Sequence, residues 1–213
     1  MKVVVVIDVF RAFTTASYVL DRQPLTYMLA LRQTVVDELA TRHMHSLVIG
    51  KPEKGTNSHI YHIPNSPTRV LEAEVKDRNI IHRTEAGAKG ILQAQEATII
   101  LAASFVNASA TVRYIKALKD YDVTIVPMGH EGSTPSLEDD ICSDYITALI
   151  NNQKRDLAHY IPQLKEGSGK YFFSTDQWQY PHEDFDRCLE VDRFNFAIQA
   201  TIHENYAVLK KCY

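Results

Sequence analysis

The sequence lacks the residues that mark disulfide-rich, zinc-binding and membrane-spanning proteins. Only three cysteines occur in 213 residues, and they lie far apart, outside any CxxC or Cys/His spacing. Neither a disulfide framework nor a zinc site is therefore indicated, and reduced thiols in a cytoplasm are the simplest interpretation. The apolar run from Val3 to Val9, broken by Asp8, is too short for a membrane span and has no signal-peptide cleavage pattern. We therefore predict a soluble, cytoplasmic protein without a membrane partner.

An excess of charge of one sign is also missing. The chain has 23 Lys and Arg against 26 Asp and Glu, so its bulk composition does not indicate a surface for nucleic acid. The GxxxxGK[ST] and GxGxxG nucleotide motifs and the GxSxG motif are absent. A haloacid-dehalogenase site would need an aspartate where Phe10 stands, and no cysteine starts a glycine-rich loop that ends in arginine. Any site must therefore be local and of another kind.

What the sequence does contain is a regular alternation of short β-branched runs and segments with helical periodicity. This alternation is typical of βα units, so we predict an α/β fold with a mostly parallel sheet and helices on both faces, as a single unit over residues 1–213. The expected strands are 2–8, 46–50, 79–83, 98–103, 123–128 and 194–200, with both faces buried because their apolar character is continuous. The expected helices are 11–20, 30–43, 67–75, 86–95, 106–119 and 137–151. Residues 152–192 show no clear period and form either a covering loop or a small subdomain.

Polar or glycine-bearing clusters follow five of the predicted strands. Because ligands of open α/β sheets bind beyond the carboxyl ends of the strands, these clusters are expected to converge on one site. The alternative is that the loops are polar only for solubility and helix capping. The clusters are Asp8 with Arg11, "GKPEKGTNS" from Gly50, Thr84 with Glu85, "SFVN" from Ser104 to Asn107, and "GHEGS" from Gly129.

The first cluster suggests a bound anion. Arg11, Thr14 and Thr15 stand in or near the first turn of a helix that follows a buried strand, where free N–H groups and the helix dipole favour phosphate or carboxylate. Asp8 would repel that anion unless a divalent cation lay between them, and Mg²⁺ suits oxygen ligands and phosphate. Alternatively, Asp8 only caps the helix and forms a salt bridge with Arg11.

A second acidic group, "SLEDD" from Ser136 to Asp140, begins the helix after the last well-defined strand. Acids in a first helical turn are ordinary because they complement the dipole. Lying opposite Asp8, however, Glu138 and Asp139 are the acids most suited to share a metal with it. His130, in the preceding glycine loop, is a candidate for substrate binding or acid/base work, although a lone loop histidine is more often a surface residue.

Taken in order, four segments resemble the motifs of the 2-phosphosulfolactate phosphatase family, the ComB-like proteins. They are "VVIDVFRAFTT", "IPNSPTRV", "AASFVNASA" and "VPMGHEGSTPSLEDDICSDYI", and the resemblance runs from residue 3 to about residue 147. A weaker match, "EDFDRCLEVDRFNF", would extend it to about residue 196.

This resemblance implies an α/β enzyme that uses Mg²⁺ to hydrolyse a small, acidic phosphomonoester, with sulfolactate and phosphate as products of the reaction in the family name. Asp8 would be a metal ligand or would align the nucleophile, and Arg11 would clamp the phosphoryl oxygens. Glu138 and Asp139 would be further metal ligands. The expected substrate-binding residues are Thr14, Thr15, Asn65, Ser66, Thr84, Asn107 and His130.

One segment departs from the family pattern. Where the family typically has TTNGT, this chain has "HRTEAGA" from His82 to Ala88, which keeps Thr84 and Gly87 but introduces Glu85. An acid near the substrate would disfavour a doubly anionic partner, so the substrate can differ from phosphosulfolactate. Two other functions stay open, an anion-binding protein that has lost catalysis and a Mg²⁺-dependent enzyme of another class. A homo-oligomer is compatible with the sequence.

Overall fold

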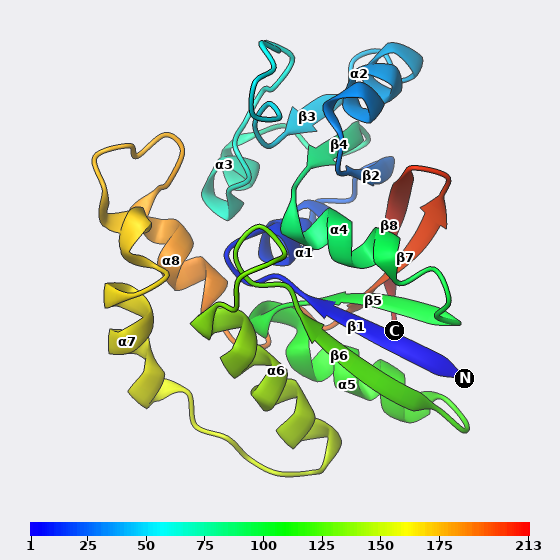
Figure 1. The fold of residues 1–213 in the computed structure, drawn as a ribbon, viewed down its shortest axis with the longest axis vertical. Helices are drawn as coiled ribbons and strands as arrows, with labels where there is room; N and C mark the ends of the chain where they lie inside the picture. The colour runs from blue at the N-terminus through cyan, green and yellow to red at the C-terminus, as the bar shows by residue number, and fades with distance from the viewer.

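The computed structural model describes all residues from Met1 to Tyr213, and its centre is one sheet of eight strands in the order β3-β4-β2-β8-β7-β5-β1-β6 (Figure 1). The strands are β1 (Lys2–Ile7), β2 (Thr26–Ala30), β3 (Leu47–Ile49), β4 (Asn79–Arg83), β5 (Ile99–Ala103), β6 (Asp122–Pro127), β7 (Ala197–His203) and β8 (Tyr206–Cys212). The α-helices are α1 (Ala12–Asp21), α2 (Gln33–Arg42), α3 (Pro67–Glu72), α4 (Ala86–Gln93), α5 (Ala108–Ala117), α6 (Leu137–Ile150), α7 (Ile161–Glu166) and α8 (His182–Cys188).

The sheet consists of two parallel groups joined by an antiparallel hairpin. In one group β1 pairs with β5 and β6, and in the other β4 pairs with β2 and β3, all in parallel. The hairpin of β7 and β8 connects the groups, because β7 pairs antiparallel with β5 and β8 pairs antiparallel with β2. The predicted α/β fold with a mostly parallel sheet is therefore confirmed.

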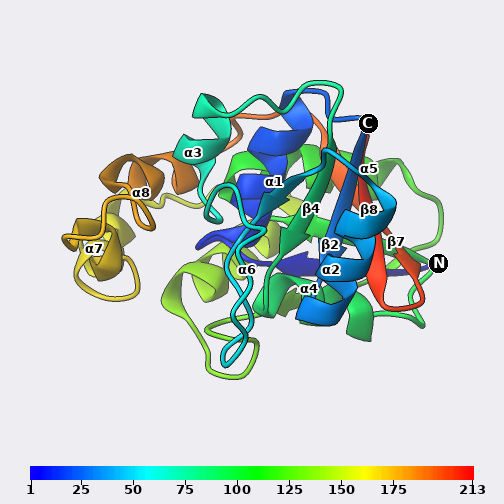
Figure 2. The same ribbon diagram turned by 90° about the horizontal axis from the view of Figure 1, so that it is seen from above.

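Helices cover both faces of the sheet, as a βα alternation requires (Figures 1 and 2). The strand β1 shows why: Val4 and Val6 join the core that contains α1, α3 and α4, whereas Val3, Val5 and Ile7 join the core that contains α5 and α6. Each buried valine of this kind contributes about 1.5–3 kcal/mol to folding. A smaller core under α2 completes the other half of the sheet.

The predicted strands differ from the structure in three respects. The strands β2 and β8 were not predicted, and the expected strand 194–200 lies three residues later, as β7. The segment "TYMLA" of β2 contains neither valine nor isoleucine, so its composition does not separate it from the helix that follows. The prediction that both faces of 123–128 are buried was wrong, because β6 is the edge strand and exposes Asp122, Thr124 and Pro127.

Residues 152–192 form several short helical segments joined by loops. They contain α7, α8 and two short 3₁₀ turns, and they lie at the end of the molecule toward which β1 points (Figure 2). Leu164, Phe172 and Phe185 pack this segment into the same core as α5 and α6. The segment therefore contributes buried side chains next to the carboxyl ends of the strands. A helix that could span a membrane does not occur in this fold.

Candidate active site

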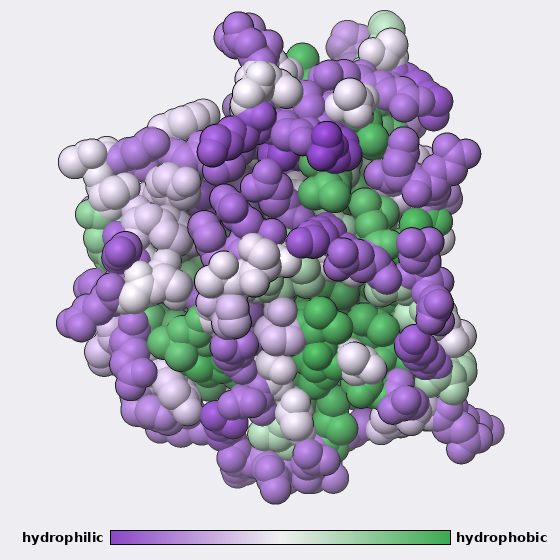
Figure 3. Space-filling view, viewed as in Figure 1, coloured by the Kyte–Doolittle hydropathy of each residue, from purple (hydrophilic) through white to green (hydrophobic).

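A cavity of about 720 Å³ opens at the carboxyl ends of β1, β3, β4 and β6. Four of the five predicted polar clusters line it, those that begin at Asp8, Gly50, Thr84 and Gly129, together with the start of α6 and part of residues 152–192. The cluster from Ser104 to Asn107 does not reach the cavity. Seen from the side used in Figure 1, hydrophilic residues gather between α3 and α4, and apolar residues gather over β1 and β6 (Figure 3).

Asp8 follows β1 directly and lies between the starts of two helices. Its Oδ1 accepts a hydrogen bond from the backbone N–H of Ala12 at 2.9 Å, which is the capping role considered from the sequence. Its Oδ2 faces α4, where a Cβ on Gly87 would lie 3.1 Å away. Burial raises the pKa of Asp8 from 3.8 to about 6, and the nearby Glu138 adds to the rise. Asp8 is thus a carboxyl group that changes protonation close to neutral pH.

Glu138 and Asp139 occupy the first turn of α6 but have different surroundings. Asp139 accepts backbone N–H groups from Val9 and Gly129, each at 2.8 Å, so it ties the loop after β1 to the loop after β6. Burial and the charges of Asp8 and Glu138 raise the pKa of Asp139 well above its ordinary value. Glu138 is 6% exposed, and its buried Oε2 has no hydrogen-bond partner. Glu138 is therefore the buried acid of this turn that has an oxygen free for a ligand.

These carboxylates suit Mg²⁺ better than a metal that needs a full set of protein ligands. The chain has no group of three or more His, Cys, Asp or Glu side chains arranged to hold a metal ion. Mg²⁺ is usually bound by one or two carboxylates together with waters and substrate phosphate oxygens. Asp8 and Glu138, with the unpartnered Oε2, fit that requirement. Asp139, whose two oxygens already accept N–H groups, fits it less well.

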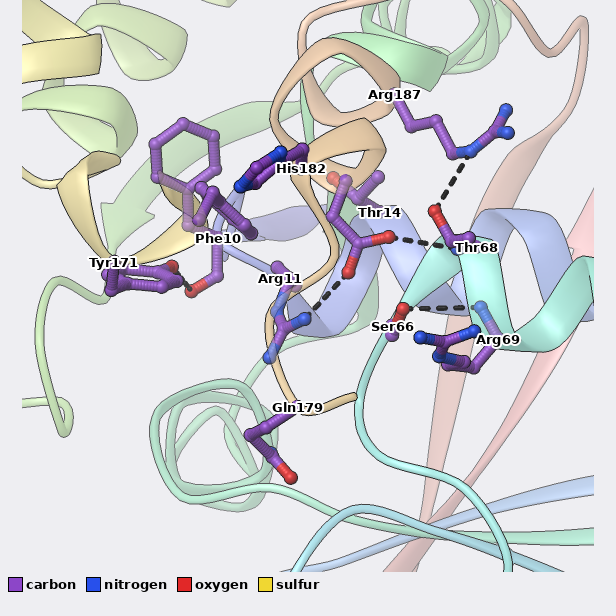
Figure 4. A network of polar contacts seen from close by, with 12 residues as sticks. Phe10, Arg11, Thr14, Ser66, Thr68, Arg69, Tyr171, Gln179, His182 and Arg187 are labelled. Carbon is purple, nitrogen blue, oxygen red and sulfur yellow. Dashed lines mark hydrogen bonds and ion pairs between the residues drawn. The ribbon is translucent and has the colours of Figure 1, made fainter. Parts of the chain in front are cut away.

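Arg11 is held in place by a buried acid from the far end of the chain. Its Nη1 donates to Oδ2 of Asp184 at 2.6 Å, and neither side chain is more than 5% exposed. The other oxygen, Oδ1 of Asp184, accepts the backbone N–H of Thr68 at 2.9 Å, at the start of α3 (Figure 4). The guanidinium group also lies 5.5 Å from the ring of Phe172 and 4.9 Å from that of Tyr180. The salt bridge considered from the sequence therefore forms with Asp184 and not with Asp8.

Four residues predicted to bind substrate lie behind the cavity wall. Thr14 donates its hydroxyl to the carbonyl of Val9 at 2.9 Å, and the hydroxyl of Thr15 is fully buried without a partner. Ser66 caps α3 by accepting the N–H of Arg69. The side chain of Asn107 bonds to its own turn. Thr14, Ser66 and Asn107 thus bond to nearby backbone groups, Thr15 is buried, and none of the four lines the cavity.

The other three predicted residues, Asn65, Thr84 and His130, line the cavity. Asn65 presents a buried Oδ1 without a hydrogen-bond partner. The side chain of His130 is 79% exposed and lies at the rim, 3.8 Å from Glu131. Asn65 is therefore better placed to recognise a ligand than His130.

The cavity also collects buried polar atoms that have no partner within the protein. Nine such side chains occur in the chain, and five of them line this cavity. Because burying an unpaired polar group costs about 1–3 kcal/mol, their gathering in one place indicates a polar ligand or ordered water. The five are Asn65, Arg83, Ser136, Glu138 and Ser168.

Comparison with known proteins identifies the family of this chain. A profile of the family described as 2-phosphosulpholactate phosphatase matches residues 1–201. The chain belongs to the 2-phosphosulfolactate phosphatase family. Members of this family are phosphoric monoester hydrolases, so the predicted resemblance and the predicted class of enzyme are both confirmed. The match also includes α7 and α8, and with them Asp184.

Curated relatives carry the name "Probable 2-phosphosulfolactate phosphatase". The chain is 29% identical to the protein of Bacillus subtilis over 190 residues, which is 87% of this chain and 81% of that protein. It is 25% identical to the protein of Thermoplasma acidophilum over 90% of this chain and 82% of that one. It is 26% identical to the protein of Clostridium beijerinckii over 73% of this chain, a match that spans 65% of the clostridial protein.

Two residues of the site were not singled out in the sequence. Asp184 lies in "EDFDRCLEVDRFNF", the weaker of the segments that resemble the family, and this match was the available signal for it. Arg83 is the last residue of β4. A charged residue after an apolar run is typical of the end of a strand, so the sequence alone does not indicate a role in binding. Only the fold brings Arg83 to the cavity, where it is 3% exposed.

Proposed function

We propose that this protein is a Mg²⁺-dependent phosphatase that hydrolyses a small phosphomonoester and releases inorganic phosphate. The observation that carries the proposal is the presence of Asp8, Arg11 and Glu138 in one cavity, as two buried carboxylates and one buried guanidinium group. The name of the relatives gives the model reaction, hydrolysis of 2-phosphosulfolactate to sulfolactate and phosphate.

Asp8 and Glu138 would hold the metal. When bound, Mg²⁺ would polarise a phosphoryl oxygen and neutralise part of the charge of the phosphate. The unpartnered Oε2 of Glu138 supports this assignment, as does the effect of Glu138 on the pKa of Asp8, since two buried carboxylates this close favour a cation between them.

Arg11 would bind the phosphoryl oxygens. Asp184 accepts a hydrogen bond from Nη1 of Arg11 alone, and Arg11 lines the cavity. A planar donor fixed in this way matches phosphate and adds stabilisation as charge shifts during P–O bond cleavage. Asp8, with a pKa of about 6, is ionised at neutral pH and so can also orient or deprotonate the attacking water.

Phosphate release from a panel of phosphomonoesters, with Mg²⁺ or Mn²⁺ and with a chelator, tests the proposal. Asp8→Asn and Glu138→Gln are each expected to lower kcat/KM by at least about 100-fold, because each removes charge that faces the phosphoryl group. The matched control is Asp140→Asn, which removes an acid from the same helical turn. Asp140 is exposed and does not line the cavity, so kcat/KM of the Asp140→Asn variant should stay within about twofold of the wild type.

A folded protein that releases no phosphate from any member of the panel would contradict the proposal. Calorimetric binding of phosphate that is independent of Mg²⁺, without turnover, would instead favour the non-catalytic anion-binding alternative. Conversion of an acidic metabolite without free phosphate would favour an enzyme of another class.

A further inference from the structure

Arg83 and Glu85 form a second charged pair in the cavity, separate from the pair of Arg11 and Asp184. Nη2 of Arg83 donates to Oε1 of Glu85 at 3.2 Å, and Nη1 donates to the carbonyl of Lys51, also at 3.2 Å. Nε of Arg83 is buried and has no partner. The pair comes from the end of β4 and the residue before α4, so it belongs to different elements from Asp8 and Arg11.

The pair offers one donor and one acceptor to the same ligand. A hydroxyl group can accept from Nε of Arg83 and donate to the carboxylate of Glu85 at the same time. A carboxylate or sulfonate can accept from Arg83 but has no proton for Glu85, and its charge would repel that of Glu85. The geometry therefore favours a neutral hydroxyl over a second strong anion.

The charge of the whole cavity also favours a ligand with a single strong anionic group. Its lining contains five acidic and four basic side chains, so it has no surplus of positive charge for a ligand with several anionic groups. One divalent cation and one phosphate dianion would leave this balance unchanged, whereas a further anion would add unpaired negative charge in a partly buried space. The acids are Asp8, Glu85, Glu131, Glu138 and Asp139, and the bases are Arg11, Lys51, Arg83 and Lys170.

The distance between the pair and the proposed phosphate site is bounded by the chain. The segment from Arg83 to Gly87 connects them, and Gly87 packs against Oδ2 of Asp8. Four residue steps span at most about 14 Å when fully extended. A small molecule can therefore contact both places.

We propose that Arg83 and Glu85 bind the end of the substrate remote from the phosphate and select a hydroxyl group there. This inference rests on the proposed function and narrows it. The substrate class is a small hydroxylated phosphomonoester, such as a polyol phosphate, in which the phosphate is the only strong acid, and it therefore differs from 2-phosphosulfolactate, the substrate in the name of the relatives.

Two compounds that differ at one carbon test the inference. In sn-glycerol 3-phosphate that carbon is CH₂OH, and in 3-phosphoglycerate it is a carboxylate. The wild type should hydrolyse glycerol 3-phosphate with a kcat/KM at least about tenfold higher, since one unfavourable charge contact in a partly buried site has about this effect. Glu85→Gln removes the charge and keeps hydrogen-bonding atoms, so it should reduce that preference by about tenfold.

Glu96→Gln is the matched control, because Glu96 is an exposed acid. It lies just before the amino end of β5, whereas the cavity lies at the carboxyl ends of the strands. This variant should leave the preference unchanged. A wild type that prefers the carboxylate, or a Glu85→Gln variant with an unaltered preference, would overturn the inference.

If neither compound releases phosphate, the proposed function fails on these substrates, and calorimetric titration of both compounds in Mg²⁺ decides the inference by itself. The inference is supported if the wild type binds glycerol 3-phosphate more tightly than 3-phosphoglycerate and Glu85→Gln removes this difference. Equal binding, or no binding of either compound, would overturn it.

Discussion

Asp184 offers the sharpest test of how the fold builds the site, because one buried carboxylate holds both Arg11 and the start of α3. Replacement by asparagine removes the charge but keeps the size and one acceptor oxygen. That oxygen can still accept the N–H of Thr68, so the backbone of α3 should stay in place. What is lost is the ion pair, in which Nη1 of Arg11 lies 2.6 Å from Oδ2 of Asp184.

The expected cost follows from burial. Asp184 is fully buried and Arg11 is 5% exposed, so the variant leaves an uncompensated charge out of water. Removing one partner of such a pair typically destabilises a protein by about 3–5 kcal/mol. Arg11 retains its contacts with Phe172 and Tyr180, but its guanidinium group is no longer fixed in direction. A displacement of about 1 Å at a reacting centre can lower the rate about 100-fold, so we expect kcat/KM to fall by between about tenfold and 100-fold.

Urea unfolding and phosphate release should be measured together for this variant. The matched control is Asp192→Asn, since Asp192 also accepts two hydrogen bonds, from the N–H and hydroxyl of Ser109, but lies outside the cavity. Asp192→Asn should lose stability without losing kcat/KM. If Asp184→Asn unfolds at lower urea but keeps the kcat/KM of the wild type, then Asp184 serves only stability and the reasoning about Arg11 is refuted.

Three further predictions concern Asp8 and its neighbours. Burial raises the pKa of Asp8 in the folded protein from 3.8 to about 6, so the free energy of unfolding falls as pH rises between these two values. In urea unfolding with a chelator, Asp8→Asn should therefore be more stable than the wild type at pH 7.5, by up to about 3 kcal/mol. Below pH 3.8 the variant should show no such gain. Mg²⁺ between Asp8 and Glu138 would lower the pKa of Asp8, so binding of the metal at about pH 6 should release a proton. Calorimetry in buffers of different ionisation enthalpy should detect this release. Binding heats that do not depend on the buffer would count against a metal at Asp8. Gly87→Ala would place a Cβ 3.1 Å from Oδ2 of Asp8 and from the side chains of Ala12 and Phe13. We expect the variant to lose about 1–3 kcal/mol of stability and to have a lower kcat/KM. Unchanged stability and unchanged kcat/KM would show that α4 can move away from Asp8.

The chain by itself determined the parts of the fold that depend on local pattern. All six predicted strands and all six predicted helices lie within three residues of their observed positions, because a buried strand has a continuous apolar run and helix faces repeat every 3.6 residues. The polar clusters after β1, β3, β4 and β6 were located for the same reason, since a strand ends where its apolar run ends. The edge strand β6 shows the limit of this reasoning, because the same apolar run occurs in a strand whose outer side faces solvent.

Which of those polar residues share a cavity was decided only by the tertiary structure. Arg11 and Asp184 are 173 positions apart and Val9 and Asp139 are 130 apart, so no local pattern could pair them. Thr14, Thr15, Ser66 and Asn107 belong to motifs as clear as those of Asp8 and Glu138, yet their side chains bond to nearby backbone or are buried beneath the cavity wall. The order of the residues sets where charge and hydroxyl groups occur along the chain. Whether such a group faces a ligand or the protein depends on side-chain direction and on the packing of distant segments, which only the folded chain defines.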